Sequence, residues 1–400
     1  MTSEVAVQNP SGADRGSGSP VRIGVATAAA FSAVLVGLGL ARFAFAPLQP
    51  ALVSANWFSA GGAALLAAAN LAGYLIGALT GSRMARRIAA PTVIRVSMLV
   101  VAVSFLVCAD QSLPYIWFFL WRLASGVSGG VIMGLAGPTV LAYVPQVRRS
   151  FIGQMVLYGL TGGIIIAGAL MPILVRSSVA RAWVVLGVIA LLTTVLTWRM
   201  WPPAPPLPPV VARVPEHARM YCFQYALVAI GLVPQMIFLV DYIARDLDRG
   251  ITTGRQFFLL YGLGAITGPL LYTYSAGRVG LRLTAKIAIA TQFFSVMLLL
   301  SGTSTPILAA ASFGGGLGMP ALIAISLLRS QQITDGDPIR HRSLWGTATA
   351  SVAVGQAIAA FGTAFLIDQL GVGGLAYPLL FVTSAAALAV AFTMDFAIRK

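Results

Sequence analysis

The sequence predicts an all-α integral membrane protein with twelve transmembrane helices, arranged as two six-helix bundles related by pseudo-two-fold symmetry. Composition is the first reason, because 58% of the 400 residues are hydrophobic and 9% are charged. A soluble domain carries about 25% charged residues. The chain also divides into apolar stretches of about 20 residues, the length that crosses a bilayer as a helix. Finally, most of the 26 lysines and arginines lie beyond alternate ends of these stretches.

The apolar stretches define the expected spans in chain order. The first six cover residues 21–53, 60–83, 92–109, 114–144, 151–175 and 182–201, and the last six cover residues 220–243, 256–276, 284–301, 306–328, 344–368 and 376–398. All tryptophans except Trp121 lie near the ends of these stretches, where aromatic residues anchor a helix at the membrane interface.

The basic residues orient the spans, because short connections rich in Lys and Arg stay on the cytoplasmic side of a membrane. Both termini are therefore expected in the cytoplasm, and the protein is expected in the bacterial inner (cell) membrane. The net charge of +15 then needs no nucleic acid, since basic loops that face anionic lipid account for it. The expected outer loops border only Arg176, Arg181, Arg245, Arg249 and Arg255.

Composition also divides the chain. Residues 1–20 are rich in Ser and Gly without an aromatic residue, which predicts a disordered cytoplasmic tail. Residues 202–217 begin with a proline-rich run that cannot be helical, which predicts a cytoplasmic linker between an N-terminal bundle, residues 21–201, and a C-terminal bundle, residues 218–400. A short motif before the fifth span recurs before the eleventh, as Arg149-Ser-Phe-Ile-Gly153 and Arg342-Ser-Leu-Trp-Gly346. This repetition favours a duplicated bundle with a site between the halves.

The residue patterns of soluble enzymes are missing. A phosphate-binding loop ends in Gly-Lys, but neither Lys286 nor Lys400 follows a glycine. His217 and His341 stand alone in cytoplasmic loops without metal-ligand spacing. We therefore expect no enzyme activity, no cofactor and no metal site.

Four segments carry motifs that resemble those of the major facilitator superfamily. The second span ends in Gly77-Ala-Leu-Thr-Gly-Ser-Arg83-Met-Ala-Arg86-Arg87, and the eighth is followed by Gly277-Arg278-Val-Gly280-Leu-Arg282. Both are similar to the superfamily's Gly-x-x-x-Asp-Arg-x-Gly-Arg-Arg signature, although both lack the acid. The fourth span adds Arg122-Leu-Ala-Ser-Gly126-Val-Ser-Gly129-Gly130, which resembles an Arg-x-x-x-Gly-x-x-Gly element. The first span, with Gly39-Leu-Ala-Arg42-Phe-Ala-Phe-Ala-Pro47, resembles the YbfB/YjiJ-like branch.

The resemblance covers residues 21 to 398. It implies a secondary transporter that works by alternating access and functions as a monomer. It also implies a gating role for the loop motif, namely for Gly77, Arg86, Arg87, Arg278, Gly280 and Arg282. Loss of both acids leaves the charge-relay latch attributed to this loop without its carboxylate, although the arginines can still hold helix C-termini or lipid.

Three charged residues are expected at membrane depth, where each costs about 2.5 to 3.5 kcal/mol at the centre of a span. Arg42 in the first span and Asp241 in the seventh are expected at similar depth, so they can pair across the bundles or bind a charged solute. The alternative for both is snorkelling to water. Arg122 is expected about 12 Å inside the fourth span. It either serves the pathway or hydrogen-bonds carbonyls of a broken neighbouring helix, such as the first span near Pro47.

Neutral polar residues recur at spacings that group side chains on one helix face. Interhelical hydrogen bonds explain such residues equally well. Asp241 is the one acid expected to carry a coupling proton, because the other candidates, including Asp395, lie near span ends. The expected substrate and ion pathway consists of Arg42, Gln49, Asn70, Tyr74, Arg122, Gln154, Tyr158, Gln235, Asp241 and Gln356.

These observations predict a secondary active transporter that moves a small solute by alternating access between the bundles. Two embedded arginines against one embedded aspartate favour a small organic anion or a polar metabolite, with a proton as candidate coupling ion and membrane lipid as the surrounding partner. Efflux of amphipathic compounds is the alternative within transport. A non-transporting membrane receptor or scaffold is the alternative outside it.

Overall fold

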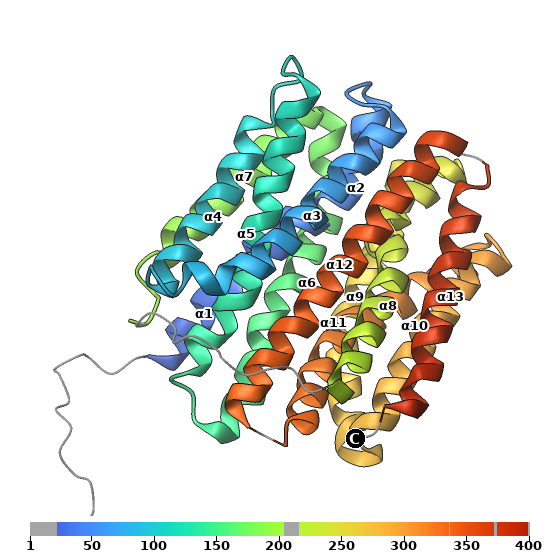
Figure 1. The fold of residues 1–400 in the computed structure, drawn as a ribbon. Coiled ribbons are helices and arrows are strands. Elements are labelled where there is room, and N and C mark those ends of the chain that lie inside the picture. Colours follow the sequence, from blue (N-terminus) through green and yellow to red (C-terminus); the bar gives the residue numbers. More distant parts are fainter. Residues whose placement is uncertain (1–21, 204–215, 336, 372–373, 399–400) are drawn as a thin grey trace, which may run out of the picture.

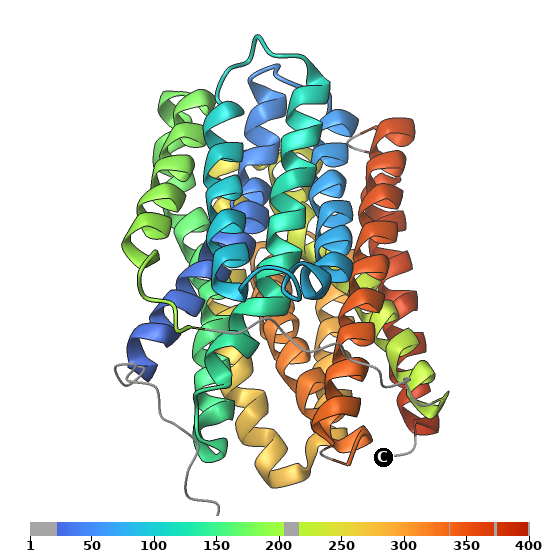
Figure 2. The ribbon, with the colours of Figure 1, turned by 60° about the vertical axis from the view of Figure 1, so that its left-hand side comes forward.

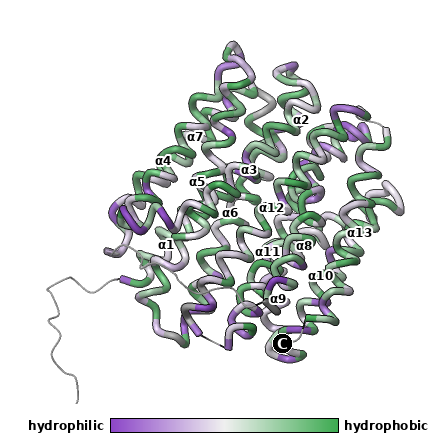
Figure 3. The backbone as a smooth tube through the Cα atoms, viewed as in Figure 1, coloured by the Kyte–Doolittle hydropathy of each residue, from purple (hydrophilic) through white to green (hydrophobic). Residues whose placement is uncertain are grey.

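The computed structural model describes residues 22–203, 216–335, 337–371 and 374–398, so the expected tail and most of the linker lie outside the described residues. The described residues form helices joined by short connections and contain no strand. Twelve of their helices are long and apolar enough to cross a membrane, and they confirm the twelve spans expected from the sequence. Hydrophobic residues dominate along the helices, and hydrophilic ones gather towards the helix ends (Figure 3).

The two halves of the chain form two groups of helices that lie side by side (Figures 1 and 2). The N-terminal bundle contains α1 Ile23–Val34, the π-helix η1 Leu35–Phe43, α2 Phe45–Ser54, α3 Ala60–Met84, α4 Ala90–Val107, α5 Tyr115–Leu141, α6 Gln146–Ser177 and α7 Val179–Thr197. The C-terminal bundle contains α8 Glu216–Asp241, the π-helix η2 Tyr242–Asp246, α9 Gly250–Val279, α10 Leu281–Ser301, α11 Thr305–Ile333, α12 Pro338–Leu370 and α13 Ala376–Ala397.

Successive α1, η1 and α2 make the first span, and α8 with η2 makes the seventh. α7 ends and α8 begins at the same end of the bundles, which we call the linker end. The opposite end is called the far end. The last helix, α13, also ends at the linker end (Figure 1).

Glycine brings corresponding helices of the two bundles into close contact. In the N-terminal bundle a methyl group on Gly77 of α3 would overlap the carbonyl group of Val127 on α5. In the C-terminal bundle a methyl group on Gly268 of α9 would overlap the carbonyl group of Leu317 on α11. Small residues allow this approach because packing, rather than expulsion of water, holds helices together in lipid. The same backbone contact therefore recurs in both halves.

Contacts between helices of the two halves join the bundles. α3 packs against α12 and α6 packs against α9, while α2 packs against both α8 and α9. Since α2 is the far-end part of the first span, the N-terminal bundle contacts the C-terminal bundle through α2 on that side.

Candidate functional site

A cavity lies between the bundles. Residues from η1, α3, α5 and α6 line one side, and residues from α8, α11 and α12 line the other. The cavity is narrow, since the centre of a water molecule can reach about 40 Å³ of it. Among the described residues that line it, Arg42 is the only charged one.

The π-helix η1 presents Arg42 to this cavity. A π-helix is wider than an α-helix, occurs mostly as a short bulge and is frequent at functional sites. The Arg42 side chain is 6% exposed, and its Nη1 donates a hydrogen bond of 3.2 Å to Oε1 of Gln356 on α12. Its guanidinium lies 4.4 Å from the ring centroid of Tyr74 on α3. The structure therefore brings together three residues of the expected pathway, two from the N-terminal bundle and one from the C-terminal bundle.

No carboxylate neutralises Arg42 among the described residues, and its buried Nε has no hydrogen-bond partner there. The sequence explains why, because Asp110 is the only acidic residue between residues 21 and 201. Asp110 lies in the loop between α4 and α5, where the backbone N–H and the hydroxyl of Ser112 donate to it and lower its pKa. Among the described residues, Arg42 thus makes its hydrogen bond and its ring contact with neutral groups.

The expected pairing of Arg42 with Asp241 is absent from this structure. Asp241 is fully buried and accepts a hydrogen bond of 2.6 Å from Nε of Arg245, one helical turn further along the chain. The hydroxyl of Tyr377 on α13 also donates to Asp241. Arg245, expected at an outer loop, instead folds back from η2 with its side chain 13% exposed. A partner four residues away reaches the carboxylate without crossing the bundle interface, so Asp241 is neutralised locally.

Arg122 supports the helix that carries Arg42. It is 3% exposed, and its Nη1 donates a hydrogen bond of 2.7 Å to the carbonyl oxygen of Ala41 in η1. Its guanidinium also lies 4.2 Å from the ring centroid of Phe45. Of the two interpretations that the sequence left open, the structure contains the hydrogen bond to a carbonyl of the broken first span. Asn70 on α3 fixes Arg122 in turn, because its Nδ2 donates to the Arg122 carbonyl oxygen at 3.3 Å.

The polar face of α6 meets α9 rather than the cavity. The Tyr158 hydroxyl donates to the carbonyl oxygen of Ile266 at 3.4 Å, and the Thr161 hydroxyl donates to that of Ala265 at 3.5 Å. Pro269 explains the second acceptor, since proline has no N–H to offer the carbonyl four residues before it. Gln154 on α6 accepts a long hydrogen bond from the Thr273 hydroxyl, which is also on α9. These expected pathway residues therefore lie at the bundle interface.

Two expected pathway glutamines are buried away from the cavity lining. Gln235 bonds within the C-terminal bundle, where its Nε2 donates to Oγ of Ser295 at 2.9 Å and its Oε1 accepts from Nε2 of Gln292 at 2.6 Å. Gln49 on α2 is fully buried, and neither side-chain polar atom has a partner among the described residues. Gln235 therefore connects helices of one bundle, and Gln49 lies on α2, where the first span contacts the C-terminal bundle.

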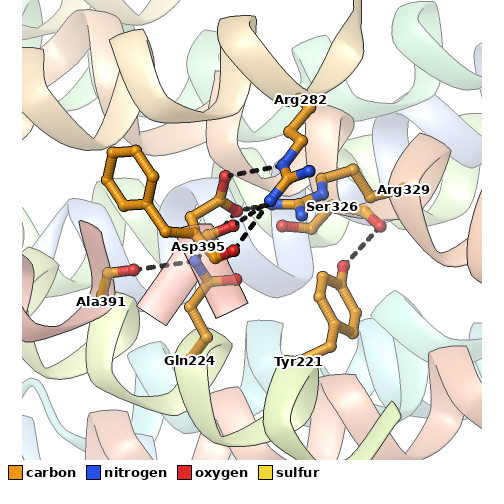
Figure 4. A network of polar contacts seen from close by, with 8 residues as sticks. Tyr221, Gln224, Arg282, Ser326, Arg329, Ala391 and Asp395 are labelled. Atoms are coloured by element: carbon orange, nitrogen blue, oxygen red, sulfur yellow. Dashed lines mark hydrogen bonds and ion pairs between the residues drawn. The ribbon is translucent and has the colours of Figure 1, made fainter. Parts of the chain in front are cut away.

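An ion-pair network at the linker end of the C-terminal bundle was not expected from the sequence (Figure 4). Asp395 was placed near a span end, yet its side chain is fully buried. It forms an ion pair with the buried Arg329 of α11 and a longer one of 3.8 Å with Arg282 of α10. Nε2 of Gln224 on α8 also donates to it at 3.2 Å. The signal in the sequence was the presence of opposite charges at linker ends of several spans, but helix packing had to show which of them meet.

This network also bears on the loop motif. Gly280 adopts a φ of +86° between α9 and α10, a conformation that glycine reaches without strain. Arg282 follows it and donates to the backbone carbonyls of Asp395 and Phe396, near the end of α13. Arg282 of the second motif copy therefore pairs with a carboxylate from α13. Of the other motif residues, Arg278 lies over the Tyr274 ring, Gly77 packs on α5, and Arg86 and Arg87 are exposed.

Comparison with known proteins agrees with this architecture. A family model described as "Uncharacterised MFS-type transporter YbfB" matches residues 34–395. No curated protein is found to match the sequence. The crystal structure of a mutant of the nucleoside transporter NupG is similar, with a TM-score of 0.71 over 95% of this chain and 100% of that chain, at 12% sequence identity. At this identity the likeness concerns the fold alone.

Proposed function

The chain belongs to the family of YbfB-like transporters of the major facilitator superfamily, and from this premise we propose that it moves a small organic anion by alternating access of the central cavity. Family and fold support secondary transport of a small solute rather than enzyme catalysis. The single observation that carries the choice of an anion is Arg42, the one charged residue in the cavity lining, which has no carboxylate partner among the described residues.

Burial of an unpaired cation is costly, and a bound anion would offset that cost. Arg42 belongs to the N-terminal bundle, and its partner Gln356 belongs to the C-terminal bundle. An anion that binds Arg42 competes with the Gln356 side chain for the same guanidinium. Solute binding would in this way replace a contact between the bundles, which is how a substrate can bias the motion of one bundle against the other.

The packing of α2 supports a closed far end. From Arg42 to the end of α2 at Ser54 the helix rises about 18 Å, at 1.5 Å per residue. Over this length α2 contacts α8 and α9, with Gln49 fully buried. Together with the distribution of arginines, this supports a cytoplasmic linker end and a cavity closed towards the outside.

A coupling proton is part of the proposal only through Asp241. Its carboxylate is held by Arg245 and Tyr377, so a coupling proton would have to displace the ion pair with Arg245. Efflux of an amphipathic compound uses the same cavity in the opposite direction, and the apolar character of most of the lining supports that alternative.

The test is solute flux in proteoliposomes with the cavity narrowed. Thr349 lines the cavity on α12, whereas Thr347 lies two residues earlier, is exposed and lies outside the lining. A panel of small organic anions is first screened by thermal stabilisation of the purified protein. Thr349→Trp should then reduce uptake and efflux of the stabilising anion at least about tenfold, while Thr347→Trp should not. Equal flux in the two variants would exclude the cavity as the route.

A further inference from the structure

We infer that the solute is an amphipathic organic monoanion, with one charged head group at Arg42 and an unsubstituted apolar body that extends towards the linker end. This inference rests on the proposed function and specifies its substrate. It depends on three properties of the lining, namely its charge, its hydrogen-bonding capacity and the distribution of its apolar side chains.

The charge of the lining limits the solute to one negative charge. Arg42 is the only cation in the lining. The other buried arginine nearby, Arg122, lies outside the lining and uses its guanidinium on the Ala41 carbonyl and the Phe45 ring. A dianion would therefore bury a second charge without a partner, and burial of an unpaired charge is strongly unfavourable.

The hydrogen-bonding capacity of the lining is low. Besides Arg42, its side chains with hydrogen-bonding groups are Tyr74, Tyr225, Thr349, Gln356 and Trp345, the last with its indole N–H alone. The ring face of Tyr74 already contacts the guanidinium, and Oε1 of Gln356 already accepts from it. A polyhydroxylated solute would thus bury hydroxyl groups that have no hydrogen-bond partner. Each buried polar group without a partner lowers the affinity about 5- to 150-fold.

The remaining lining forms an apolar path away from Arg42. On α12, Gln356 and Trp345 lie about 16 Å apart along the helix axis, and Met236 and Tyr225 lie equally far apart on α8. The rings of Tyr225 and Trp345 face each other at the linker side, with centroids 6.5 Å apart. This length accommodates an aromatic ring or a medium-length alkyl chain behind a head group at Arg42.

Methionine makes this path adaptable. Met133, Met236 and Met319 come from three different helices of the lining. Thioether side chains adjust to irregular shapes and make favourable contacts with aromatic rings. The lining therefore selects an apolar body without specifying its outline, whereas Arg42 specifies the charge.

The test uses ligands that differ in one property at a time. The probe is p-toluenesulfonate, an aromatic monoanion that stays ionised and crosses lipid slowly. Its neutral counterpart is p-toluenesulfonamide, its doubly charged counterpart is p-benzenedisulfonate, and glucose represents polyhydroxylated solutes. Binding to the purified full-length protein is measured by thermal stabilisation and titration calorimetry, and uptake of the labelled probe is measured in proteoliposomes. We expect p-toluenesulfonate to bind at least about tenfold more tightly than each of the other three.

Variants assign the head group. Arg42→Gln should weaken p-toluenesulfonate binding about 30-fold or more, the effect of removing one partner of a buried charge pair, and should bring its affinity close to that of p-toluenesulfonamide. Arg42→Lys should restore part of the difference. The exposed Arg181 provides the matched control, because Arg181→Gln removes the same charge outside the cavity. Melting of each variant without ligand shows whether it is folded.

The possible results separate the two proposals. Tighter binding of p-benzenedisulfonate or glucose would overturn the amphipathic monoanion while leaving transport intact. Undiminished binding in a folded Arg42→Gln variant would overturn the assignment of the head group. Absence of binding and uptake for p-toluenesulfonate would overturn the substrate class. The proposed route itself fails only if narrowing the cavity at Thr349 leaves the flux of every stabilising anion unchanged.

Discussion

Two buried arginines of the N-terminal bundle are held by neutral groups, whereas two arginines of the C-terminal bundle are held by carboxylates. Arg42 and Arg122 contact a glutamine amide, a backbone carbonyl and two aromatic rings. In the other bundle, Arg245 and Arg329 form ion pairs with fully buried aspartates. A charge that is already neutralised by an ion pair attracts a charged ligand weakly. A cation held by neutral groups remains able to attract an anion. The comparison therefore separates charges that stabilise one bundle from a charge that is available to a solute.

The cost of removal differs accordingly. Loss of one member of a buried ion pair strands the other charge, and this typically costs 3–5 kcal/mol. Replacement of a buried arginine among neutral groups removes a desolvation penalty together with the contacts it made. We therefore expect substitutions in the C-terminal network to affect folding most, and substitutions around Arg42 to affect solute handling most.

The largest effect is expected for Asp395→Asn. Arg329 is buried and would lose its carboxylate, so the free energy of unfolding should fall by about 3–5 kcal/mol. Thermal unfolding of the purified protein measures the change. Asp337→Asn is the control, because its ion pair with Arg340 is exposed and such pairs contribute about 0–1 kcal/mol. Equal melting temperatures for the two variants would show that the buried ion pair of Asp395 contributes no more to stability than an exposed one, against the role assigned here to the carboxylates of the C-terminal bundle.

Arg122→Ala should have the next largest effect, and mainly on transport. The charged hydrogen bond to Ala41 is worth about 1.5–3 kcal/mol, and its loss should let η1 shift and displace Arg42. We expect KM to rise roughly 10- to 100-fold at matched membrane levels, with a smaller fall in melting temperature. Arg122→Lys should recover only part, since lysine lacks the planar group that lies over Phe45. A normal KM in a folded alanine variant would separate Arg122 from the positioning of Arg42.

Much of this organisation could be predicted from the sequence, because it depends on local patterns. The spans follow from runs of apolar residues, and Arg42 is identifiable as a charge inside such a run. The sequence also contains the local partner of Asp241, since Arg245 follows at the i+4 position. Arg245 lies near the end of its span, however, so its sequence position is equally consistent with a loop.

The remaining features depend on how the helices rotate and pack. Gln235 is a polar residue in a span, and only the rotation of α8 decides whether it faces the cavity or the Ser295 side of its own bundle. Asp395 meets Arg329 because α13 lies beside other helices of its bundle in a particular register. No spacing within one helix contains that information, so neither assignment could be made from the sequence.

A double-mutant cycle sharpens the comparison between the bundles. Arg42 and Asp241 share no partner in the structure, so Arg42→Gln and Asp241→Asn should add within about 0.5 kcal/mol in the free energy of unfolding. Asp241→Asn combined with Arg245→Gln should instead deviate from additivity by about 0.5–3 kcal/mol, because the two side chains are in contact. Strong coupling of Arg42 with Asp241 would restore the pairing across the bundles that the sequence suggested.

The smallest effect is expected where the two bundles meet. Thr161 and Tyr158 donate long hydrogen bonds from α6 to carbonyls of α9, one of them freed by Pro269. Hydrogen bonds between membrane helices average about 0.6 kcal/mol, so Thr161→Val combined with Tyr158→Phe should change the balance between conformations by a factor of about 3 to 10. These bonds join the bundles rather than stabilise either one, so the melting temperature should stay nearly constant.

The labelling rate of Thr349→Cys by a polar maleimide reports this balance, since position 349 lines the cavity, provided that the native Cys108 and Cys222 are first replaced by alanine. Thr193→Val is the matched control, because the Thr193 hydroxyl bonds to a carbonyl within α7 alone. The control should leave the labelling rate unchanged while the interface variant alters it. A lower melting temperature with an unchanged labelling rate would mean that the contact between α6 and α9 is a fixed part of the fold. The movable interface between the bundles would then have to lie at other helices.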